Sequence, residues 1–89
     1  MTPTRSEAAE ILTEAICTTD GLAELTSAPT AEQVEAMHFV AVEDIAPAAV
    51  CEELEIERGS TWGDVIAEIR SDLGPLADRL GVPKVPARA

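Results

Sequence analysis

The sequence is poor in aromatic and in basic residues. Its 89 residues include one Phe, one Trp and no Tyr, and 6 Lys and Arg stand against 17 Asp and Glu. The net charge of −11 excludes the usual basic nucleic-acid-binding protein, because phosphate contacts require clustered Lys and Arg. A chain of this length forms one small domain that buries only about 60% of its unfolded surface, so a partner or self-association adds stability.

Targeting and membrane signals are also missing. No apolar run approaches the ~20 residues of a membrane span, and the residues after Met1 lack the hydrophobic segment of a secretory signal. We therefore expect a cytoplasmic protein in which Cys17 and Cys51 are free thiols, with a disulfide between them as the alternative. One Lys against five Arg, with much Ala, is typical of a GC-rich coding sequence and indicates a bacterial or phage source.

The residues that catalysis or metal binding needs do not fall into a recognisable pattern. His38 is the single histidine, and its distance from Cys17 and Cys51 does not match a zinc motif. No phosphate-binding glycine motif is present. We predict no enzyme, no catalytic residue, no metal and no cofactor, and we interpret His38 as a buried or boundary residue of a helix.

Apolar residues recur at helical spacing along most of the chain. This pattern predicts an all-α fold, a small compact bundle of four to five short helices, with residues 1–81 as the domain and 82–89 as a flexible C-terminal tail. The expected elements are a helix over 6–18 behind the capping box of Thr4 and Glu7, a single turn at 22–25, a helix from the Thr30 cap to about Val42, a helix capped by Glu43 or Asp44 with Pro47 in its first turn, a helix bearing the stripe Trp62, Val65, Ile66, Ile69 and Leu73, and a short helix from Pro75 to Gly81.

Residues 37–42 admit a second interpretation. They are apolar nearly all round, and Phe39, Val40 and Val42 favour a strand. We prefer a helix, because the chain offers no second strand to pair with it. A helix that is apolar on every side must lie centrally or must dimerise.

Residues 46–69 resemble a helix-turn-helix motif. The stretch 49–61 reads AVCEELEIERGST, with the motif's small residue, leucine, isoleucine and polar turn in order, and Glu55 stands at the usual place of the turn glycine. The resemblance implies helix-turn-helix geometry in the second half of the chain and makes a divergent DNA-binding regulator the alternative function. The segment holds six acids and one base, Arg58, so we expect no direct binding to nucleic acid.

The charge is strongly segregated along the chain. Residues 6–57 contain thirteen acids and no Lys or Arg, whereas residues 58–89 contain four acids and five bases. One interpretation is a solvated face that keeps the protein soluble. The interpretation that we favour is a non-enzymatic interaction protein that binds and modulates a basic protein partner, as a nucleic-acid mimic, an inhibitor or an antitoxin-like regulator does. A structural or assembly subunit, including a homodimer formed through the helix at 31–42, is a further alternative.

The acids around the third predicted helix are the candidate contacts. Several crowd its end, where the helix dipole prefers cations, so their placement there does not serve stability. Trp62 lies on the apolar stripe of its helix, so we interpret it first as a core residue. The alternative is an interface anchor, because tryptophan is enriched at binding hot spots. The candidate partner-binding residues are Glu43, Asp44, Glu52, Glu53, Glu55 and Glu57.

Overall fold

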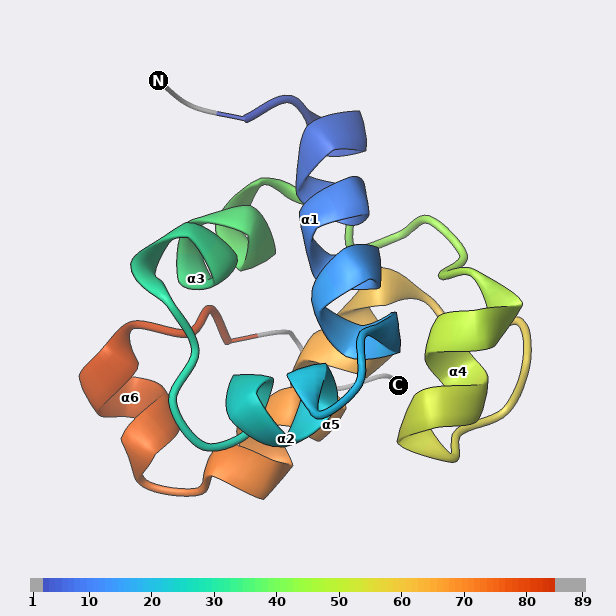
Figure 1. Cartoon of the computed structure of the whole chain (residues 1–89). Coiled ribbons are helices and arrows are strands. Elements are labelled where there is room, and N and C mark those ends of the chain that lie inside the picture. The colour runs from blue at the N-terminus through green and yellow to red at the C-terminus, as the bar shows by residue number, and fades with distance from the viewer. Residues whose placement is uncertain (1–2, 85–89) are drawn as a thin grey trace.

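The computed structural model describes residues 3–84, which form six helices and no named strand (Figure 1). The prediction of a small all-α bundle is confirmed. The central helix α1 packs against α2, α3 and α4, while α5 packs against α4 and α6. The helices are α1 (Arg5–Cys17), α2 (Gly21–Leu25), α3 (Ala31–Phe39), α4 (Ala48–Leu54), α5 (Trp62–Leu73) and α6 (Leu76–Leu80).

Three of the helices begin with a capping box. In α1, α3 and α5 a threonine side chain accepts a hydrogen bond from the N–H of the residue three positions later, whose own side chain accepts from the N–H of the threonine. These bonds satisfy two of the N–H groups that a helix start leaves without an intrahelical partner. The pairs are Thr4 with Glu7, Thr30 with Gln33, and Thr61 with Asp64. The starts of these helices are therefore encoded locally.

The core of the described residues contains only apolar side chains. Helix α5 contributes the predicted stripe of Trp62, Val65, Ile66, Ile69 and Leu73, and α1 contributes Ala8, Leu12 and Ile16. Trp62 is only 3% exposed, so its indole is part of the core. The preferred interpretation of Trp62 as a core residue is confirmed, and the ring is not presented on the surface as the alternative interface anchor requires.

Helix α3 ends earlier than predicted. It stops at Phe39, and Val40 is already extended with ψ 145°. Residues 37–42 are therefore neither a helix throughout nor a strand, and Phe39 and Val42 are each 38% exposed rather than central. The helix ends here because the following residues make backbone contacts with the start of α5.

Residues 42–46 pair with residues 60–63 in an antiparallel arrangement, with a single β-bridge between Ile45 and Thr61. We call this pairing the junction. The N–H of Trp62 donates to the carbonyl of Asp44, and the N–H of Gly63 donates to the carbonyl of Val42, both at 2.9 Å. Together with the capping box of Thr61, the junction provides an acceptor for each of the first four N–H groups of α5.

Helix α4 also begins later than predicted. Pro47 occupies its N-cap position, and no side chain caps the helix. Glu43 and Asp44 lie three or more residues before Pro47, within the junction, so they do not cap α4. The delay has a local cause, because a residue that precedes proline, here Ala46, disfavours helical backbone.

The packed domain continues past the predicted boundary at residue 81. Val82 is 4% exposed, and its N–H donates to the carbonyl of Ala77 at 3.0 Å. Of the predicted tail at 82–89, residues 85–89 lie outside the described residues.

Gly21 permits the close approach of α2 to α1. A Cβ added at Gly21 meets the carbonyl oxygen of Ala15 at 1.9 Å, whereas a Cβ at Gly59 meets nothing within 4 Å. We expect Gly21→Ala to lower the free energy of unfolding by about 2–3 kcal/mol through overpacking. In the matched control, Gly59→Ala, the added Cβ meets no atom and only the backbone φ of +90° is strained. We expect this variant to lower the free energy of unfolding by about 1 kcal/mol. Urea unfolding measures both values, and equal losses would contradict the clash.

Candidate protein-interaction surface

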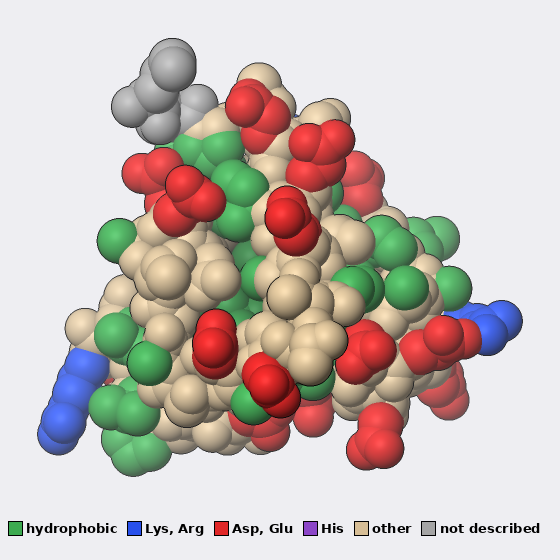
Figure 2. Space-filling view, in the orientation of Figure 1, with side chains coloured by type: hydrophobic (Ala, Val, Ile, Leu, Met, Phe, Trp, Pro, Cys, Tyr) green, Lys and Arg blue, Asp and Glu red, His purple; other side chains and the backbone are tan. Residues whose placement is uncertain are grey.

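The acidic residues lie on the surface, and few of them are neutralised by the protein itself. No charged side chain is buried in the described part of the chain. Of the thirteen acids in residues 6–57, two form ion pairs there: Glu43 with Arg5, at 3.8 Å, and Glu52 with Arg58. Figure 2 shows acidic side chains spread over α1, α2, α3 and α4, with basic side chains only at the edges of that face. The other eleven carboxylates form no ion pair within residues 3–84, and one of them, Glu7, takes part in the capping box of α1.

The structure divides the six predicted contact residues into two groups. Glu43 and Asp44 lie next to the start of α4, whereas Glu52, Glu53, Glu55 and Glu57 lie at its end and in the following turn. All six are exposed. Residues 45–51, which include the first four residues of α4, lie between the two groups. The second group, which we call the α4 corner, is the denser one.

Glu55 occupies an unusual backbone position. Its φ of 58° and ψ of 38° place it in the left-handed region, where glycine is the preferred residue at the end of a helix. This is the position at which the helix-turn-helix resemblance places a turn glycine. Residues 55–61 separate α4 from α5, a connection of seven residues against the three or four typical of that motif.

A hollow of about 310 Å³ between α1, α2 and the start of α3 brings together acids that the sequence did not associate with one another. Glu14, Glu24 and Glu32 come from the three helices and line it together with the apolar side chains of Ile11 and Ala15. A lysine or arginine side chain fits this chemistry, because its aliphatic stem covers apolar surface while its charged head meets carboxylates. We call this feature the acidic hollow.

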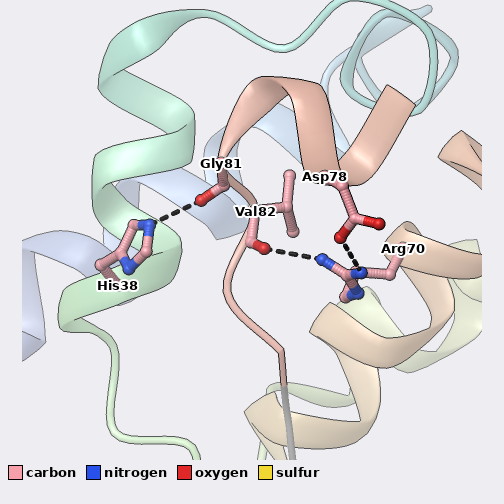
Figure 3. A network of polar contacts seen from close by, with 5 residues as sticks. All are labelled: His38, Arg70, Asp78, Gly81 and Val82. Atoms are coloured by element: carbon pink, nitrogen blue, oxygen red, sulfur yellow. Dashed lines mark hydrogen bonds and ion pairs between the residues drawn. The ribbon is translucent and has the colours of Figure 1, made fainter. Parts of the chain in front are cut away.

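A polar network fixes the C-terminal end of the described chain (Figure 3). Arg70 donates from Nη1 to the carbonyl of Val82 at 2.7 Å and from Nη2 to Oδ1 of Asp78 at 2.8 Å. The hydrogen bond from Arg70, together with its positive charge, holds the pKa of the Asp78 carboxyl below its usual value. His38 Nε2 lies 2.7 Å from the carbonyl oxygen of Gly81, so this exposed side chain links α3 to the end of α6.

The two cysteines lie in different environments. Cys17 is exposed, Cys51 is buried, and both are free thiols. Within residues 3–84 no three His, Cys, Asp or Glu side chains are grouped in a way that would hold a metal ion. In the same range no helix has both the length and the apolar character needed to cross a membrane.

Comparisons of the chain with known protein families, with curated proteins and with solved structures found no match.

The backbone at Glu55 predicts a gain in stability on substitution. We expect Glu55→Gly to raise the free energy of unfolding by about 1 kcal/mol, because glycine adopts the left-handed conformation without strain and the change removes a negative charge from a helix end. Glu53→Gly, within the last turn of α4, removes the same charge but costs about 1 kcal/mol. Chemical denaturation of both variants tests this, and a loss of stability in Glu55→Gly would contradict it.

The Arg70–Asp78 pair predicts a pH-dependent contribution. Because the native pKa of Asp78 is lowered, the pair stabilises the fold fully above the ordinary aspartate pKa of about 3.9, and the contribution is lost as the pH falls through the lower native value. We expect Asp78→Asn to be less stable than the parent at neutral pH, with the difference shrinking as the pH falls below about 4. Urea unfolding across this range measures the difference, with Asp72→Asn as the control for loss of one exposed charge.

Proposed function

We propose that this chain is a non-enzymatic acidic protein that binds a basic surface of a protein partner and thereby modulates it. The observation that carries the proposal is the excess of exposed carboxylates in residues 6–57. The two arginines closest to them, Arg5 and Arg58, are each already paired with a glutamate. The remaining eleven acids form a field of one sign that attracts a cationic surface over several ångströms.

The mechanism we propose is electrostatic steering followed by occlusion. A partner that normally binds phosphates presents Lys and Arg side chains, which the acidic face would attract and cover. The α4 corner supplies the convex contact, and the acidic hollow supplies a place for one inserted Lys or Arg. Glu55 supports this assignment, because an acid in a left-handed position at a helix end lowers stability and so serves something else.

The test is affinity capture from the host lysate with the whole chain, at low and at high salt, followed by a binding assay with the captured protein. We expect a basic, nucleic-acid-handling protein that is retained at low salt and lost at high salt. Capture of no partner, or of one that ignores salt, would contradict the proposal. A DNA-binding assay in parallel tests the helix-turn-helix alternative, for which retarded migration at physiological salt is the diagnostic result.

Matched charge variants then locate the contact. The α4 corner is neutralised by E53Q/E55Q/E57Q and the acidic hollow by E14Q/E24Q/E32Q, while the control E68Q/D72N removes two negative charges outside residues 6–57. We expect each of the first two variants to weaken binding about tenfold, and the third to have little effect. Equal losses in all three would show that only bulk charge matters, and no loss in any would remove the acidic face from the interface.

A further inference from the structure

An apolar hollow lies on a different part of the surface from the α4 corner, between α3 and α6. It has a volume of about 550 Å³. Phe39 of α3 and Leu80 of α6, each 38% exposed, both line it. The other lining residues are Pro29, Ala31, Val34, Glu35 and His38. A mostly apolar hollow of this kind in a strongly charged chain indicates a contact surface.

Exposed apolar side chains also lie on both sides of this hollow. A second, more polar hollow, lined by Val42 together with Thr4, Arg5 and Glu43, shares His38 and Phe39 with the first. On the other side Leu76, 42% exposed, lies one helical turn before Leu80 on α6. Four of the five large apolar side chains that are exposed in the described residues therefore belong to this surface, and Ile45 is the fifth.

The two helices beside the hollow carry exposed charges of opposite sign. Arg79 lies in the last turn of α6, and Glu35 lies on α3. Both are exposed, and neither forms an ion pair within residues 3–84. Figure 2 shows a basic side chain beside apolar ones at the α6 edge of the molecule.

We propose that this surface is the interface of a symmetric dimer of the chain. In a two-fold dimer the same patch meets itself, so each contact occurs twice. A two-fold axis through the hollow sets α6 of one copy on α3 of the other. Phe39 and Leu80 are then covered, and Arg79 of each copy meets Glu35 of the other. A second copy is the occupant that matches both the apolar lining and the two opposite charges.

The dependence on salt concentration distinguishes this dimer from the proposed partner complex. Each copy carries a net charge of −11, so long-range repulsion opposes dimer formation and is screened by salt. Binding of a basic partner to the acidic face weakens with salt, whereas this dimer strengthens. The dimer does not rest on the proposed function, and either can fail alone.

The first test is sedimentation equilibrium of the full chain over a range of concentrations, at low and at high salt. We expect a reversible monomer–dimer equilibrium that favours the dimer at high salt. F39S and L80S should each raise the dissociation constant about tenfold or more, while I45S, at a side chain 69% exposed outside the hollow, should leave it unchanged. Circular dichroism confirms that each variant is folded. A monomer under all conditions, or a dimer that ignores Phe39 and Leu80, would overturn the proposal.

A charge exchange provides the sharper test. General repulsion predicts that E35R, which makes the chain less negative, tightens the dimer, whereas the proposed pairing with Arg79 predicts that it weakens the dimer. We expect R79E and E35R each to raise the dissociation constant several-fold, and R79E/E35R to restore it. A double variant as weak as the worse single variant, or a tighter dimer in E35R, would overturn the proposed arrangement.

Discussion

Two stretches of backbone, residues 42–46 and 60–63, hold each other in place, and most of the fold follows from this junction. It accompanies the end of α3 at Phe39, because the chain turns at residues 42–44 and their carbonyl groups accept from the start of α5. It satisfies the first N–H groups of α5, the helix that contributes more core residues than any other. The two stretches lie directly before α4 and directly after the turn that follows it. Their hydrogen bonds therefore hold together the two ends of a loop that contains α4 and its acidic turn.

This arrangement separates the charged surface from the apolar one. The α4 corner lies on this loop, where its exposed glutamates are not required by the core. The apolar hollow lies between α3 and α6, and Arg79 is next to Leu80 in the last turn of α6. The two surfaces differ in chemistry, so the proposed dimer and the proposed partner complex would respond to salt in opposite directions.

The sequence predicted what depends on neighbours along the chain. The capping boxes of α1 and α3 and the buried stripe of α5 were identified correctly, because each rests on residues within a few turns of one another. The predicted positions of the end of α3 and the start of α4 were wrong. Both depend on the junction, which joins residues about eighteen apart, and the residues of the junction do not show the apolar spacing of a helix or a strand. The acidic hollow was missed for the same reason, since Glu14, Glu24 and Glu32 belong to three different helices.

The position of Trp62 has a spectroscopic consequence. It is the single tryptophan in a chain that has no tyrosine, and it lies in the core at the first residue of α5, where its own N–H takes part in the junction. Near-ultraviolet absorption and intrinsic emission therefore come almost entirely from one indole in one environment. Changes in that emission will report whether α5 stays joined to residues 42–46. Events confined to the surface of the protein will change the tryptophan emission little.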